Sequence, residues 1–179
     1  LDPTARELAN RRGVCEVVPG SLPDATPFAE RKFDLILMLD VLEHIEDDIG
    51  ALAAARNLLK PSGHLLLTVP AYQWLWSDHD VVHHHHRRYN SGTLRRCVEH
   101  AGLSHASLGY FNTFLFPPIA CVRLMQKALN RTSHAALSIP SKRLNALLEG
   151  IFAMERHLIS RISFPFGTSL FAILECDRR

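Results

Sequence analysis

The chain has 179 residues, about the size of one domain, of which 47% are hydrophobic and 21% are charged. This composition excludes a disordered, collagen-like or low-complexity chain. Twenty Lys and Arg residues against 18 Asp and Glu residues give a net charge of +2, which is too small to indicate a nucleic-acid partner.

Cysteine usage and hydropathy point to a reducing compartment. The four cysteines lie far apart and form no CxxC pair. We therefore expect free, buried thiols in a cytoplasmic protein, and neither a zinc site nor a disulfide framework. Because no run of 18 uncharged apolar residues occurs, we expect no membrane span, and we find no signal peptide. The first residue is Leu, which favours a fragment of a longer chain.

Apolar runs alternate with segments of helical period, a pattern typical of βαβ units. We expect helices over residues 5–12, 47–59, 91–101, about 117–130 and 141–160, and strands over 14–18, 33–39, 64–69, 104–110 and 168–175. The run at 33–39 (FDLILML) is a continuous apolar run apart from Asp34, as in a central strand covered on both faces. Residues 70–90 form a polar and aromatic loop of about twenty residues, long enough to indicate a function.

Residues 111–165 differ in charge from the rest of the chain, with seven Lys and Arg against two Glu. We expect one α/β domain made of residues 1–110 and 166–179, with 111–165 as a helical insertion or cap. Its apolar first helix carries cations on one face, which also fits a membrane-surface helix. A cap or a packed helix pair is favoured, while peripheral membrane contact and a homo-oligomer interface stay open.

Two segments carry the argument for function. In LILMLDVLEH (35–44), an apolar strand ends at Asp40, and open α/β sheets bind ligands beyond the carboxyl ends of their strands. In LLKPSGHLLLTVP (58–70), a helix end and a Pro-Gly turn lead into another strand. In this order the segments resemble the class I S-adenosylmethionine-dependent methyltransferases, over residues 1 to 110. The resemblance implies a doubly wound, Rossmann-like, mostly parallel sheet and S-adenosyl-L-methionine as cofactor.

The resemblance also implies which residues contact the cofactor. In the family an acidic residue that ends the second strand binds the ribose hydroxyls, the next turn contacts adenine, and the fourth strand end borders the methionine part. The matching positions are Asp2, Ser21, Leu22, Leu39, Asp40 and His44. Many members have Asp where this chain has Ser21. The alternative is that Glu43 and His44 only cap the helix that follows the strand.

The family's Gly-rich loop is not matched. That GxGxG loop ends the first strand, approaches the cofactor with its backbone, and would precede Asp2 by about twenty residues. We therefore expect an N-terminally incomplete domain. A second hypothesis is a non-catalytic scaffold relative that has lost cofactor binding. A third, a nicotinamide-dependent Rossmann oxidoreductase, fits the VLEH and LLKPSG segments poorly.

The loop between the fifth strand and the next helix matches a pattern, HD…HxRRY, found in a subset of these methyltransferases. The resemblance thus places His79, Asp80, His85, Arg88 and Tyr89 at the mouth where the methyl acceptor sits. If the acceptor is a hydroxyl, His79 or His85 would take its proton while the neighbouring carboxylate fixes the tautomer. Arg88 suits a carboxylate or phosphate on the acceptor. Alternatively, the arginines only begin the next helix and Tyr89 packs beneath it.

The four consecutive histidines at 83–86 raise the question of a metal. Imidazole and carboxylate suit Zn, Ni or Fe, but consecutive residues cannot all point to one ion, so we expect no metal. The run is internal and short, which argues against a purification tag. The acceptor classes compatible with the loop are small metabolites, quinone precursors, sugars and lipid-linked glycans.

Overall fold

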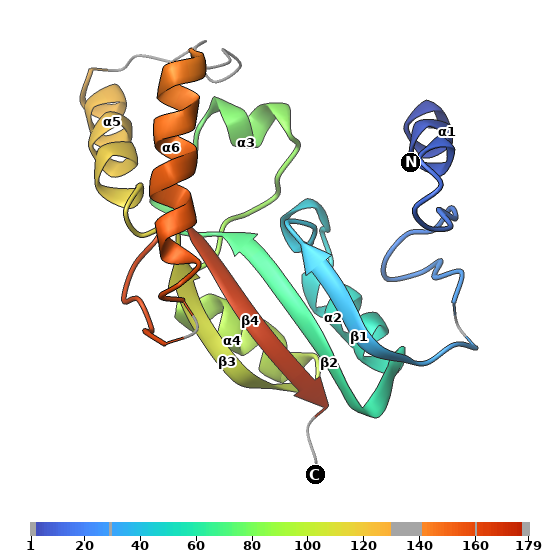
Figure 1. Cartoon of the computed structure of the whole chain (residues 1–179). Helices are drawn as coiled ribbons and strands as arrows, with labels where there is room; N and C mark the ends of the chain where they lie inside the picture. Colours follow the sequence, from blue (N-terminus) through green and yellow to red (C-terminus); the bar gives the residue numbers. More distant parts are fainter. Residues whose placement is uncertain (1–2, 29, 130–140, 160, 177–179) are drawn as a thin grey trace.

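The computed structural model describes residues 3–28, 30–129, 141–159 and 161–176. Its centre is a four-stranded sheet in the order β1-β2-β4-β3 (Figure 1). The strands are β1 (Phe33–Leu39), β2 (Leu59–Pro70), β3 (Leu103–Phe111) and β4 (Ser169–Cys176). β1 pairs with β2 in parallel, whereas β4 runs antiparallel to both β2 and β3. The fold is α/β and Rossmann-like as predicted, with its parallel pairing confined, among the described strands, to β1 and β2.

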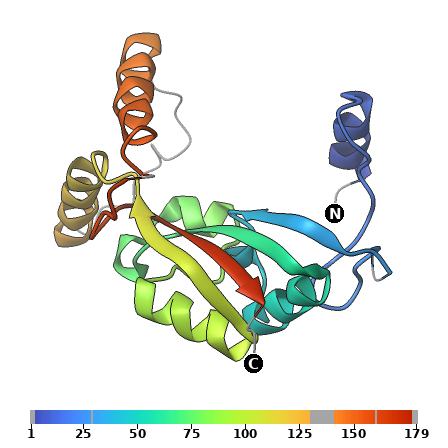
Figure 2. The same cartoon turned by 60° about the horizontal axis from the view of Figure 1, so that its bottom comes forward.

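Helices α2 (Asp48–Asn57) and α4 (Ser91–His100) lie along one face of the sheet (Figure 2). Each begins at a side-chain cap, because the carboxylate of Asp47 accepts from the Gly50 amide and the Asn90 side chain accepts from the Thr93 amide. Alternate strand residues point to this face and form the core. The fully buried ones include Leu65, Leu67, Val69, Leu170, Ala172 and Leu174.

The opposite face is open along β1, where Leu35, Leu37 and Leu39 are 56%, 55% and 49% exposed. The prediction of a central strand covered on both faces is therefore wrong for the part of the chain that the structure describes. β1 is an edge strand there, and its second edge has no partner strand. The predominantly apolar sequence predicted the strand correctly but could not show which of its faces is packed.

The N-terminal segment also departs from prediction. Helix α1 (Pro3–Arg11) is present, but no strand forms over 14–18. Instead, the Asn10 side chain donates to the Val17 carbonyl at 3.2 Å and accepts from the Val17 amide at 3.0 Å, so it takes the place of a strand partner. Asp2 lies outside the described residues.

β2 begins five residues earlier than predicted, because Leu59 already pairs with Phe33 at the start of β1; the register then shifts before His64 pairs with Leu35. Gly63 is required at this close approach, since a Cβ there would lie 2.7 Å from the carbonyl oxygen of Phe33.

The predicted loop after β2 contains two short helices, η2 (Gln73–Leu75) and α3 (Asp78–Val82). A further short helix, η1 (Leu42–His44), follows β1 directly. Within the predicted insertion lie α5 (Phe116–Ala128) and α6 (Lys142–Glu155), both beyond the end of the sheet (Figures 1 and 2). Among the described residues, no helix has the length and apolar character needed to cross a membrane.

Candidate functional site at the carboxyl end of the sheet

A pocket of about 880 Å³ lies between the N-terminal segment and the end of β1. Its walls bring together Ser21 and Leu22 from the first segment, Val41 and His44 after β1, and His86 from the loop after α3. The volume is within the usual range for small-molecule and cofactor sites. Three of the predicted cofactor residues, Ser21, Leu22 and His44, thus line one pocket.

Leu39 and Asp40 do not line this pocket but stand beside it, exposed at the end of β1. Asp40 has a φ of 51°, a strained value for a residue other than glycine. Thr68 at the end of β2 holds this turn, because its hydroxyl accepts from the Asp40 amide at 3.0 Å and donates to the Asp40 carboxylate at 3.2 Å. Such strain is found most often at functional sites, where the surrounding structure fixes it.

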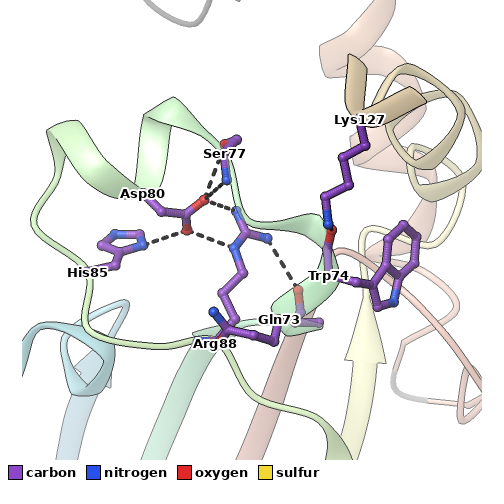
Figure 3. Close-up of polar contacts among 8 residues, drawn as sticks. Gln73, Trp74, Ser77, Asp80, His85, Arg88 and Lys127 are labelled. Carbon is purple, nitrogen blue, oxygen red and sulfur yellow. Dashed lines mark hydrogen bonds and ion pairs between the residues drawn. The ribbon is translucent and has the colours of Figure 1, made fainter. Parts of the chain in front are cut away.

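Asp80 is the centre of a buried polar network at the start of α3 (Figure 3). Its side chain is completely buried and caps the helix by accepting from the Ser77 amide at 2.8 Å and the Ser77 hydroxyl at 3.2 Å. Arg88 donates to both carboxylate oxygens, from Nε at 2.7 Å and Nη2 at 3.0 Å. His85 Nδ1 lies 2.9 Å from Oδ1. Burial alone would raise the pKa of Asp80, but the hydrogen bonds and charge of Arg88 outweigh it and lower that pKa.

The loop that carries His85 is fixed to the start of α2. The His86 amide donates to the Glu43 carbonyl at 2.7 Å. Arg87 forms an ion pair with Asp48 at 2.9 Å, and the Tyr89 hydroxyl donates to the same carboxylate at 2.8 Å. These contacts join the loop after α3 to the segment after β1, which is about forty residues earlier in the chain. His85 is held in place from both sides as a result.

This fixation sets His85 against Glu43 and His44. The rings of His44 and His85 meet edge to face at 4.6 Å between centroids. One carboxylate oxygen of Glu43 and a ring nitrogen of each histidine lie within 4.8 Å of one another. Glu43 is only 1% exposed, and its Oε2 has no hydrogen-bond partner among the described residues. Burial raises the pKa of Glu43 to about 7, and it also lowers the pKa of His44.

His79 occupies a different place from His85. It is exposed on α3, and its ring lies 4.2 Å from that of His83, one helical turn later. Burial of part of the ring and the neighbouring His83 lower the pKa of His79. The described structure shows no side-chain hydrogen bond that would fix the tautomer of His79, whereas Asp80 does so for His85.

The structure therefore separates the predicted acceptor-site residues by environment. His85 and Arg88 meet at Asp80, whereas Tyr89 is 3% exposed and faces Asp48 in the interior.

Lys127 of α5 donates to the Trp74 carbonyl at 2.6 Å, which ties the insertion to this loop (Figure 3). The sequence alone indicates neither the burial of Glu43 nor the role of Asp48 in linking Arg87 and Tyr89 to the start of α2. The contact between His79 and His83 could have been predicted from the sequence, because residues four apart in HDVVH lie on the same side of a helix.

Comparisons with known proteins agree with this architecture. A family model described as a methyltransferase domain matches residues 4–108, more than half of the chain. The chain belongs to this methyltransferase family. The match includes β1, β2 and the whole loop that carries Asp80 and His85, and it stops within β3.

Individual relatives support the same family. A ubiquinone biosynthesis O-methyltransferase of Cereibacter sphaeroides strain KD131 is 33% identical over 64 residues, which are 36% of this chain and 26% of that protein. The chain thus aligns with about a quarter of the length of this methyltransferase relative.

Two solved structures share the fold. The mitomycin 7-O-methyltransferase MmcR aligns with a TM-score of 0.51 and 14% identity over 96% of this chain and 38% of its own. The protein in complex with the Haloferax volcanii Trm112 methyltransferase activator aligns with a TM-score of 0.58 and 15% identity over 98% of this chain and 69% of its own.

Proposed function

We propose that this methyltransferase domain transfers a methyl group from S-adenosylmethionine to a hydroxyl acceptor. Family membership supports methyl transfer, and the O-methyltransferase names of relatives support oxygen as the methylated atom. The pocket lined by Ser21, Leu22 and His44 is the proposed cofactor site, with Asp40 beside its methionine end. The residues present fit the cofactor, because the pocket is large enough and mainly apolar, with a carboxylate and a histidine at its rim.

The single observation that carries the mechanism is the hydrogen bond between Asp80 and His85. Methyl transfer is an in-line displacement, so the protein mainly aligns the reactants and excludes water. A hydroxyl acceptor must also lose its proton. Asp80 holds the proton of His85 on Nδ1, which leaves Nε2 as the atom that accepts the acceptor's proton. Arg88 keeps Asp80 ionised and acts as a positioning residue.

The helical insertion supports an acceptor with an apolar part. Val122, Leu124 and Met125 of α5 are 50%, 57% and 56% exposed, and Lys127 of the same helix contacts the loop near the site. We propose that a lipid-linked or prenylated acceptor lies along this helix. The protein should therefore sediment with anionic lipid vesicles, and Leu124→Glu should reduce that binding.

The test of the mechanism pairs two adjacent histidines. Acceptor probes of phenolic, sugar and polyprenol-linked type are screened with labelled S-adenosylmethionine, in the presence of EDTA. With the accepted probe, His85→Asn should lower kcat by about 10²–10⁴-fold, the usual contribution of a general base. His84→Asn is the matched control, because His84 is exposed with a φ of 55° that Asn adopts readily. Wild-type kcat in His85→Asn would contradict the assignment.

A further inference from the structure

We propose that Glu43, His44 and His85 form a binding site for a divalent transition-metal ion, with Zn²⁺ as the best-fitting ion. This departs from the expectation of no metal, which considered only the consecutive histidines at 83–86. The proposed site takes one histidine from that run and two residues from the segment after β1. The site shares His85 and His44 with the proposed methyl transfer, but metal binding is measured separately, without cofactor.

The first argument is the donor set. Two imidazoles and one carboxylate are the protein ligands of many catalytic zinc sites, which keep a fourth position open. The three donor atoms lie within 4.8 Å of one another. A tetrahedral ion with bonds of about 2.0–2.1 Å needs its ligand atoms about 3.4 Å apart. The three side chains must therefore move closer together when the ion binds.

The buried carboxylate of Glu43 also favours a cation at this place. A carboxylate that is 1% exposed, with one oxygen lacking a partner among the described residues, is costly to bury. Its backbone is fixed by the hydrogen bond from the His86 amide to the Glu43 carbonyl. A cation between Glu43 and the two histidines would bind the free oxygen and offset the burial of its charge.

The hydrogen bond between His85 and Asp80 is of the kind that orients metal ligands. Histidine ligands of metals usually donate their second ring N–H to a carboxylate, which fixes the tautomer and raises the basicity of the ligating nitrogen. Asp80 accepts from His85 Nδ1 at 2.9 Å, and Arg88 and Ser77 hold Asp80 in turn. The nitrogen of His85 that Asp80 leaves free is therefore pre-oriented. The His79 and His83 pair has no comparable carboxylate support in the described structure.

A bound ion would occupy the same His85 nitrogen that accepts a proton in the proposed methyl transfer. Metal-bound and metal-free protein would then activate the acceptor differently. For this reason the mechanism test uses EDTA and the metal test omits cofactor, so that failure of one proposal is distinguishable from failure of the other.

The experiment is calorimetric titration of Zn²⁺ into the metal-free 179-residue chain, with Co²⁺ absorption spectra in parallel. We expect one tight site per chain and the visible bands of four-coordinate Co²⁺. Glu43→Gln, which conserves shape, should weaken binding by at least about 100-fold, given that even supporting residues around ligands contribute 10–100-fold. His83→Ala is the control and should leave affinity unchanged. A wild-type chain without a tight site, or loss of binding in His83→Ala but not in Glu43→Gln, would overturn the proposal.

Discussion

The substitution Asp80→Asn tests whether the buried network at α3 holds the acceptor loop. The two carboxylate oxygens of Asp80 accept five contacts, from Arg88 twice, Ser77 twice and His85 once. Asn replaces one oxygen with an NH2 donor. Placed at Oδ1, this donor faces the Arg88 Nε and His85 Nδ1 groups. Placed at Oδ2, it faces the Arg88 Nη2 group and the Ser77 amide. At least two charge-assisted hydrogen bonds are lost in either orientation.

The expected loss in the free energy of unfolding follows from these contacts. Each hydrogen bond to a charged group contributes about 1.5–3 kcal/mol, and removing one partner of a buried ion pair costs about 3–5 kcal/mol. We therefore expect Asp80→Asn to lose about 3–5 kcal/mol at pH 7, a large share of the stability of a typical domain. Urea unfolding measures this loss. Asp78→Asn, two residues away on the same helix with no side-chain hydrogen bond given by the structure, is the matched control.

The pH dependence gives an independent check with a defined sign. The folded pKa of Asp80 is lowered from its ordinary value of 3.8. The network therefore contributes its stability above about pH 4 and loses it as the pH falls through the folded pKa. Wild-type protein should lose stability on acidification more steeply than Asp80→Asn. A loss below about 1 kcal/mol at pH 7, comparable to that of an exposed ion pair, would refute the network's structural role.

Two further predictions concern other buried groups. The pKa of Glu43 rises from an ordinary value of 4.5 to about 7, so the folded state holds a proton that the unfolded chain releases, and stability falls as the pH rises through this window. In EDTA, Glu43→Gln should therefore be more stable than wild type at pH 8 by roughly 3 kcal/mol and similar to it near pH 4. Equal stability of the two proteins at pH 8 would contradict a buried carboxylate. Burial of the thiol, and secondly the neighbouring Asp48 carboxylate, raise the pKa of Cys97 to about 12. A thiol reagent at pH 8 should therefore label the exposed Cys15 and Cys121 quickly and Cys97 only on unfolding. Fast labelling of Cys97 in the folded protein, detected by peptide mass, would contradict its buried position within α4.

The local sequence predicted those parts of the fold whose periodicity is clear. Strands β1 and β4 appeared close to their predicted bounds because each is a short apolar run, and helix α4 did so because its buried face repeats with helical period. Helix α3 was missed, since its five residues depend on Ser77 and Asp80 capping each other and on Arg88. The strand expected at 14–18 failed because the Asn10 side chain satisfies Val17 locally.

The candidate site was predictable only in part. The HD…HxRRY pattern located the loop, and the turn after β1 was singled out because strands of α/β folds end at ligand sites. The sequence could not show that these two segments meet, because the contact depends on Asp48 binding both Arg87 and Tyr89. The burial of Glu43 is likewise a property of the folded chain. The local sequence around position 43 therefore does not predict that Glu43 is buried.

The most direct test of the proposed methyl transfer is binding of S-adenosylhomocysteine, measured by calorimetry. We would titrate the 179-residue chain and a form extended upstream along its reading frame. Ser21→Trp, which would fill the pocket beside His44, serves as the blocked control. The account predicts micromolar binding by the extended form, lost in Ser21→Trp. Absence of binding to both forms would contradict it and favour a methyltransferase-like scaffold that does not bind the cofactor.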